Sequence, residues 1–242
     1  MSYPFPPIER IVYPKTFLKD VHIIFRFDAM SRNAELDTAV EKFFKESFLL
    51  KEISISSLEK GMKVFSKDEQ TIFIFGADFV ELSVKQPEYV SYDHILPYRE
   101  LLRKYLQTLK VGELKKLVMY KYNQLEYLAN DKKQAKDVIC DVLNSELMSD
   151  ARDVLDDYTR WEKTKHFSDD DSQSQFTIEY GFRKDTQNPK NGALTMKIQI
   201  ESMEDVIAST DVEKKMELFN QILDNGFHWC VVPEIINMMK KV

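Results

Sequence analysis

The residues best suited to chemistry in this sequence are four histidines and two cysteines. No two histidines have the i, i+4 spacing with which a helix binds zinc, and neither a CxxC nor an HExxH motif is present. Glycine-rich phosphate loops and the GxSxG nucleophile elbow are also missing. The sequence therefore predicts no metal site, no cofactor and no recognisable catalytic residue.

One short segment, His228-Trp229-Cys230, combines a titratable ring, a large aromatic side chain and a thiol. A nucleophilic cysteine–histidine pair requires side-chain contact and a third group that orients the histidine, and the sequence shows no such group. Packing in the core or at an interface is therefore the favoured interpretation. We keep His228 and Trp229 as candidate interaction residues.

Three consecutive aspartates, Asp169 to Asp171, could bind a cation through carboxylate oxygens. They lie in a serine-rich stretch, residues 168–174, whose composition is typical of a solvated link. We therefore expect a hydrophilic connection there and no metal ion.

The elements that position these residues are organised around the middle of the chain. Apolar residues spaced three and four apart predict a helix over residues 92–110, with Pro97 in its first turn and Arg99 on its solvated side. A strand follows over residues 113–127, with Val118, Tyr120 and Tyr122 on one face. Tyr120 and Tyr122 could form a ligand-facing platform, although packing on a sheet is favoured.

Alternating and helical patterns predict the other elements. Four prolines favour an extended arm over residues 1–20, anchored by its apolar side chains Phe5, Ile8, Ile11, Val12 and Tyr13. We expect strands at residues 21–27, 48–64, 70–84 (a hairpin), 176–182 and 194–200. Helices are expected at residues 28–49, 131–164 (one or two helices) and 211–225, the last ended by Gly226, and a short final helix runs from Pro233 to Met239.

This pattern predicts an α+β fold with mostly antiparallel strands covered by amphipathic helices. The 242 residues are enough for one stable unit without disulfides. Two related halves, residues 1–129 and 130–242, are the alternative, because both runs place strands before a helix.

Charge and cysteine usage limit the function classes. A net charge of −6 and a pI of about 5.4 disfavour nucleic-acid binding, since the phosphates would repel the chain. Two cysteines, Cys140 and Cys230, without a signal peptide favour a reducing cytoplasm. No apolar stretch reaches bilayer length, so no membrane contact is expected.

Five stretches follow the outline of one protein family: residues 5–9 (FPPIE), 26–27 (RF), 89–93, 116–123 (KLVMYKYN) and 223–239. They resemble a sporadically distributed bacterial family of unknown function, which has a Pro-Pro-hydrophobic-Glu arm and a central strand similar to GLRYIN. The central strand here keeps Asn123 and has Val118, Tyr120 and Lys121 where the family has glycine, arginine and tyrosine. His228 would match a C-terminal histidine of the family. The resemblance implies a bacterial source and no established activity.

These observations favour a non-enzymatic binding or accessory protein that acts through protein–protein contacts or self-association. The alternative is an enzyme with an unrecognised site near His228 or near the tyrosines Tyr120 and Tyr122. Neither the ligand nor the oligomeric state follows from the sequence.

Overall fold

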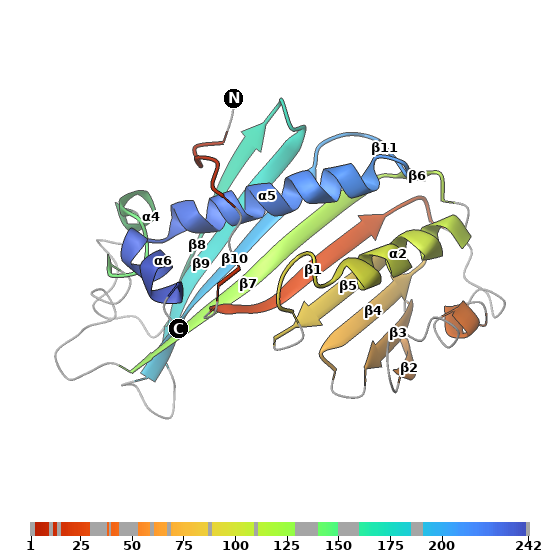
Figure 1. Ribbon diagram of the computed structural model, residues 1–242, viewed down its shortest axis with the longest axis horizontal. Coiled ribbons are helices and arrows are strands. Elements are labelled where there is room, and N and C mark those ends of the chain that lie inside the picture. The colour runs from red at the N-terminus through yellow and green to blue at the C-terminus, as the bar shows by residue number, and fades with distance from the viewer. Residues whose placement is uncertain are drawn as a thin grey trace. The chain divides into compact units, whose positions relative to one another are not determined.

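The structure is a computed structural model, and it describes residues 3–9, 12–13, 16–29, 38, 40–43, 53–58, 61–66, 69–86, 89–108, 111–128, 140–149, 160–184 and 191–240 (Figure 1). Across these ranges, no helix is long and apolar enough to cross a membrane. Of the helix predicted at residues 28–49, residues 38 and 40–43 are helical, and the rest lies outside the described residues apart from residues 28 and 29.

The chain forms two compact units, and each is assembled from segments that are distant in the sequence. Unit 1 contains Met1–Lys19, Tyr120–Ile200 and Gln221–Val242, and unit 2 contains Asp20–Met119 and Glu201–Asn220. The predicted halves, residues 1–129 and 130–242, stay a prediction.

Unit 2 is built on strands that follow the order β2-β3-β4-β5-β1, and the pairs of known register are antiparallel. Val21, Ile23 and Phe25 point into the core, while His22 and Ile24 lie on the other face, as the alternation predicts. The hairpin predicted at residues 70–84 is also confirmed, with its turn at Ala77-Asp78. The strands are β1 (Leu18–Arg26), β2 (Ile53–Leu58), β3 (Gly61–Ser66), β4 (Thr71–Gly76) and β5 (Phe79–Lys85), and β6 (Glu113–Leu114) pairs separately with β11 (Ile207–Ala208).

Helix α2 (Leu96–Thr108) confirms the predicted central helix, and Pro97 lies in its first turn. Its aromatic residue Tyr105 packs edge-on against Phe75 of β4, with ring centroids 4.6 Å apart. The prediction that Arg99 is solvated is wrong, because its side chain is only 2% exposed. Its guanidinium donates to the carboxylate of Glu213 at 2.6 Å and lies 3.7 Å from the centre of the Tyr92 ring. An ion pair and an aromatic face thus replace the water that the guanidinium loses.

Unit 1 contains most of the strands that follow the order β7-β10-β9-β8, namely β7 (Lys116–Leu128), β8 (Arg160–Asp169), β9 (Ser174–Lys184) and β10 (Asn191–Ser202). The inward residues predicted for β9 and β10 are all buried: Phe176, Ile178, Tyr180, Phe182, Leu194, Met196, Ile198 and Ile200. This alternation confirms two strands with one wet face. The fold class is therefore α+β, as predicted.

The helix predicted over residues 131–164 is only partly correct. Helix α4 (Ser145–Ser149) is present, residues 131–139 and 150–159 lie outside the described residues, and residues 160–164 begin strand β8. Residues 168–174 form the end of a β8–β9 hairpin and not a link, with Gln173 at a positive φ of 47° in the turn. Pairing of β8 with β9 outweighs the weak helix preference of its lysines and glutamate.

The inward face of β7 carries two polar residues. Lys121 and Asn123 are buried, whereas Tyr120 and Tyr122 are half-exposed on the outer face of the sheet. The Lys121 ammonium bonds to the Asp224 carboxylate at 2.5 Å. Because this partner compensates for its lost hydration, a lysine can occupy an inward position.

The prediction that Gly226 ends the last long helix is wrong. Helix α5 (Val212–Cys230) continues for another turn beyond it. A Cβ atom on residue 226 would lie 2.3 Å from Cζ of Phe176 in β9, so glycine here permits close helix–sheet packing and is no terminator. Helix α6 (Pro233–Met239) has the predicted bounds and begins with proline.

Both units share one order of elements. In unit 2, β1 lies beside β5, the last strand of the run β2 to β5, and helix α2 follows. In unit 1, β7 lies beside β10, the last strand of the run β8 to β10, and helix α5 follows. The segments from β1 to α2 and from β7 to α5 therefore have the same order of elements, and the predicted halves stay untested.

Candidate functional site

The candidate residues His228, Trp229 and Cys230 lie at the end of α5, where their side chains have separate surroundings. His228 is half-buried, and its Nε2 atom lies 2.5 Å from the hydroxyl oxygen of Tyr13. Burial lowers the pKa of His228, with a smaller contribution from Lys240, while Asp224 opposes the change. Cys230 is 0% exposed, and burial raises its pKa, which disfavours the reactive thiolate.

Trp229 belongs to an aromatic cluster in unit 1. Its ring centroid lies 5.6 Å from that of Phe5 and 5.6 Å from that of Phe167. Phe5 is only 7% exposed, which confirms it as an anchor of the N-terminal arm. Val12 is 60% exposed and is not an anchor, and Ile11 lies outside the described residues.

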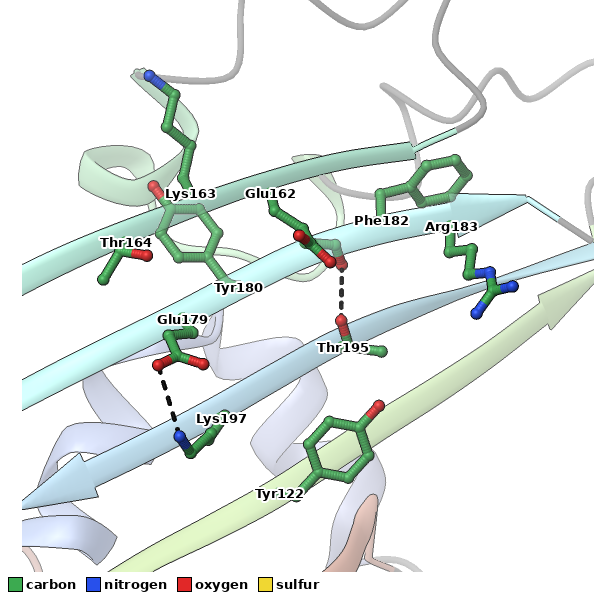
Figure 2. Close-up of a pocket in the computed structure, with 11 residues that line it drawn as sticks. Tyr122, Glu162, Lys163, Thr164, Glu179, Tyr180, Phe182, Arg183, Thr195 and Lys197 are labelled. Atoms are coloured by element: carbon green, nitrogen blue, oxygen red, sulfur yellow. Dashed lines mark hydrogen bonds and ion pairs between the residues drawn. The ribbon is translucent and has the colours of Figure 1, made fainter.

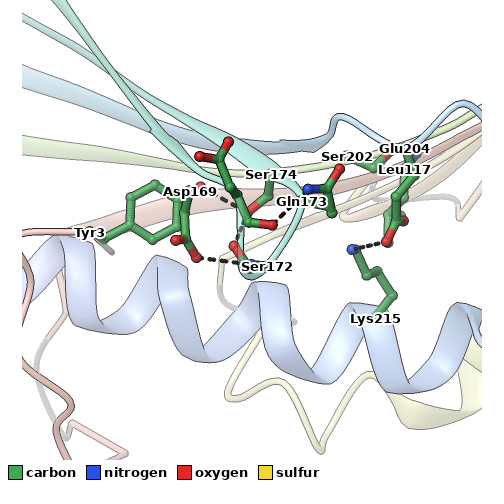
Figure 3. Close-up of polar contacts among 10 residues, drawn as sticks. Tyr3, Leu117, Asp169, Ser172, Gln173, Ser174, Ser202, Glu204 and Lys215 are labelled. Carbon is green, nitrogen blue, oxygen red and sulfur yellow. Dashed lines mark hydrogen bonds and ion pairs between the residues drawn. The ribbon is translucent and has the colours of Figure 1, made fainter. Parts of the chain in front are cut away.

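Asp169, at the β8–β9 turn, forms hydrogen bonds within the turn. Asp169 is 7% exposed, and its carboxylate accepts the Ser172 N–H at 3.1 Å. Burial alone would raise the pKa of Asp169, but hydrogen bonds from Ser172 and the Asp171 backbone outweigh it, and the pKa falls below its ordinary value. Figure 3 shows this turn beside Tyr3 and Ser174. Among the described residues, no three His, Cys, Asp or Glu side chains could hold a metal ion.

A hollow in unit 1 is a groove on the wet face of its sheet, with a volume of about 310 Å³ (Figure 2). We call it the outer groove. Four neighbouring strands contribute to it, because outward residues of β7, β8, β9 and β10 lie side by side. The outward residues in its lining are Tyr122, Glu162, Thr164, Glu179, Gly181, Arg183, Thr195 and Lys197, and Lys163, Tyr180 and Phe182 of the other face also border it.

The floor of the outer groove is formed at Gly181. This residue lies opposite Glu162 in the register of β8 and β9, and its carbonyl accepts the Thr195 hydroxyl of β10 at 3.4 Å. Because glycine has no side chain, the sheet is hollowed between two longer neighbours. The outward alternation of β9 places Glu179 and Arg183 on either side of this hollow.

Charges of both signs surround the floor of the groove. The Lys197 ammonium lies 3.4 Å from the Glu179 carboxylate and 4.8 Å from the centre of the Tyr120 ring. Arg183 is exposed at the other end of the groove. Tyr122 lines the groove, and its hydroxyl donates to Gln124 at 3.5 Å. The two candidate tyrosines therefore lie at this site, one in its lining and one beneath its lysine.

A second polar cluster, in unit 2, was not predicted from the sequence. The Nδ1 atom of His22 lies 2.6 Å from a Glu81 carboxylate oxygen, and Nε2 lies 3.3 Å from Asp20 and 3.3 Å from the Ser83 hydroxyl. Burial lowers the pKa of His22, but hydrogen bonds and charge from Asp20 and Glu81 outweigh it, and the pKa lies above its ordinary value. Alternation could have placed Asp20 and His22 on one face, but only the β1–β5 register brings Ser83 opposite His22.

The chemistry of the His22 cluster is that of an ion-pair network. Ser83, His22 and Glu81 have the order of a nucleophile, a base and an orienting acid. Asp20, however, lies at the same nitrogen as Ser83 and favours the imidazolium, which cannot accept a proton from the serine. The carboxylates lie at opposite nitrogens of the ring, so His22 and both acids cannot bind one metal ion together.

Comparison with known proteins adds no relative, because the chain matches no protein-family model and no curated protein sequence. The resemblance to the bacterial family described above therefore stays a prediction.

Proposed function

We propose that this chain is a binding protein that holds a segment of a protein partner in the outer groove of unit 1. The observation that carries the proposal is a hollow over Gly181 that is surrounded by outward side chains of four strands. Sites for small molecules are enclosed and predominantly apolar. This groove is instead open to solvent and has charged side chains of both signs beside its carbon surface, which suits a peptide with side chains of its own.

The lining also predicts what the partner presents. A small apolar side chain would fill the space above Gly181, in van der Waals contact with Thr195. A carboxylate would pair with Arg183, since guanidinium groups bind carboxylates through two parallel hydrogen bonds. Tyr122 supplies the rigid aromatic surface that is common at the centre of protein interfaces.

Two substitutions test this proposal. Gly181→Val would fill the hollow while keeping a residue that suits a strand. Arg183→Glu would reverse the charge at the end of the groove. If each removes a contact worth about 2 kcal/mol, affinity for the partner falls roughly 30-fold. Ala208→Val and Lys214→Glu, at exposed positions outside the groove, are the matched controls.

The assay is capture from a native bacterial lysate by the tagged chain, followed by titration of each captured protein against every variant. A true partner is retained by the wild type and both controls and is lost by both groove variants. Light scattering after size-exclusion chromatography tests self-association with the same variants. Equal binding to all five chains would refute the groove as the site.

The cytoplasmic location and the bacterial source belong to this proposal. Both cysteines, Cys140 and Cys230, are unpaired, which supports a reducing compartment. The net charge of −6 supports a protein partner in preference to a nucleic acid.

An enzyme is the second candidate, and the contact between Tyr13 and His228 favours it. The histidine has a lowered pKa and lies one helical turn beyond Asp224, which binds Lys121. Such a group could transfer a proton near neutral pH. A His228→Gln chain that folds normally but loses an activity found by substrate screening would support this candidate, and full retention of that activity would exclude His228.

A further inference from the structure

The N-terminal arm occupies a site in unit 1 whose contacts are those of a bound peptide. Residues 3–9 form no helix or strand, and Pro4, Pro6 and Pro7 restrict them to extended conformations. Prolines reduce the entropy that an extended segment loses on binding, as in proline-rich ligands of other domains. The arm is therefore suited to recognition by side chains.

Aromatic side chains bind the first part of the arm. Phe5 lies in a box made by Phe167, Phe176 and Trp229, with centroid distances of 5.7, 4.6 and 5.6 Å. Tyr3 stacks on Phe5 at 5.1 Å, and its hydroxyl lies 2.8 Å from the Ser174 hydroxyl (Figure 3).

Two amide side chains of α5 bind the backbone of the next part. The Ile8 N–H donates to the Asn225 side-chain oxygen at 3.1 Å, and the Ile8 carbonyl accepts from Gln221 at 3.2 Å. Gln221 also donates to Asn225 at 2.9 Å, which fixes the two amides relative to each other. Both polar groups of one arm residue are thus satisfied by side chains, without a neighbouring strand.

We infer that this arm site, formed by Phe167, Ser174, Phe176, Gln221, Asn225 and Trp229, also binds the arm of a second copy of this chain. The occupant is specified by what the site already holds: a tyrosine hydroxyl, an aromatic ring two residues later and an extended backbone three residues beyond it. The identical segment of a second copy supplies these groups at the same spacing. Arm exchange then links two copies without any new contact chemistry.

Competition decides which arm is bound. A tethered arm has an effective concentration that reaches the millimolar range for short flexible connections, so it excludes a free arm at low protein concentration. Weakening the chain's own arm should open the site to an arm added in trans. This inference concerns a different surface from the outer groove and does not depend on it.

A labelled peptide tests the recognition step. A fluorescent peptide with the sequence of residues 2–9 (SYPFPPIE) is titrated into the full chain and into its Phe5→Ala variant, with binding followed by anisotropy. The variant should bind at least about tenfold more tightly than the wild type, because its own arm competes poorly. A control peptide with alanine at the Phe5 position should not bind.

A complementation experiment tests the second copy as the occupant. The Phe5→Ala chain keeps the arm site and lacks a good arm, whereas the Gln221→Ala/Asn225→Ala chain keeps the arm and has a weakened site. Each alone should be a monomer by light scattering, and an equimolar mixture should form a one-to-one dimer.

Three results would overturn the inference. The first is the absence of peptide binding to a Phe5→Ala chain that circular dichroism shows to be folded. The second is equal binding of the control peptide. The third is peptide binding with a mixture that stays monomeric, which would exclude the second copy. If Phe5→Ala does not fold, the milder Phe5→Leu chain takes the same tests, and unchanged peptide affinity in that chain would equally overturn the inference.

Discussion

Replacing Gly226 by alanine should destabilise the protein, although alanine is the better helix former. The residue lies inside α5, where alanine normally stabilises a helix by about 1 kcal/mol relative to glycine. The new Cβ atom would lie 2.3, 2.8 and 3.2 Å from three carbons of the Phe176 ring. Two of these distances are too short for carbon atoms, so the ring or the helix must move.

The ring has little room to move. Phe176 is fully buried and packs against Phe5, at a centroid distance of 4.6 Å, and against Phe167, at 6.5 Å. Overpacking of a core costs about 1–3 kcal/mol, and the lack of room places this site in the upper part of that range. After subtraction of the helix preference, we expect a net loss of about 1–2 kcal/mol in the free energy of unfolding.

Urea unfolding followed by circular dichroism measures this loss. Gly112→Ala is the matched control, because a Cβ there meets no atom within 4 Å, and it should be neutral or slightly stabilising. The double variant Gly226→Ala/Phe176→Leu should lose less than the sum of the two single variants, since the smaller side chain leaves space for the new methyl group.

A Gly226→Ala chain as stable as the wild type, or more stable, would refute this reasoning. It would mean that helix preference outweighs the contact and that α5 does not need to approach β9 so closely. Additive losses in the double variant would also contradict the proposed contact.

Other predictions concern the histidines, a helix cap and the buried arginine. In an NMR pH titration, His22 should have a pKa above that of an ordinary histidine and His228 a pKa below it, because ion pairs outweigh burial only at His22. A histidine whose pKa is raised in the folded state makes its full contribution to stability below its unfolded-state pKa. This contribution is lost as the pH rises through the folded-state pKa. His22→Gln should therefore cost about 1–3 kcal/mol near pH 5.5 and much less near pH 9, and equal losses in urea unfolding would contradict the network. Asn144→Ala should cost about 1–2 kcal/mol in thermal unfolding, since Asn144 accepts the Leu147 N–H at 2.9 Å at the start of α4. Asn144→Asp should keep this cap but lose the hydrogen bond that the Asn144 amide donates to the Trp229 carbonyl, so its stability should lie between those of Asn144→Ala and the wild type. Arg99→Met should cost about 1–3 kcal/mol, less than a fully buried ion pair, because its carboxylate partners remain partly hydrated, and a loss below about 0.5 kcal/mol would show that the pair is dispensable.

Local patterns in the sequence correctly predicted the elements whose residue pattern alone reports which side chains are buried or where a helix begins. Alternation along residues 176–182 and 194–200 identified β9 and β10 and their inward faces, because each position reports one side of a sheet. Proline at position 233 indicated the start of α6, since its fixed φ and missing N–H suit the first position of a helix and not its interior. The sequence identified Tyr120 and Tyr122 as candidate interaction residues, but it did not predict the groove beside them.

The outer groove and the arm site depend on residues that are distant in the sequence. Gly181 hollows the groove only because Glu162 and Thr195 flank it on neighbouring strands. The partner of Ile8 is Asn225, more than two hundred positions away. No periodic pattern in the sequence predicts such contacts. Periodicity and propensity describe a residue's own segment and not the strand or helix that will lie beside it.

The amino-acid sequence by itself thus determined the α+β class, the amphipathic faces and most element positions, since each follows from local solvation and backbone preference. Only the tertiary structure decided that Lys121 is buried, that residues 160–169 form a strand and that α5 continues through Gly226. In each case a partner brought near by folding, a carboxylate, a neighbouring strand or an aromatic ring, outweighs a local preference of about 1 kcal/mol or less.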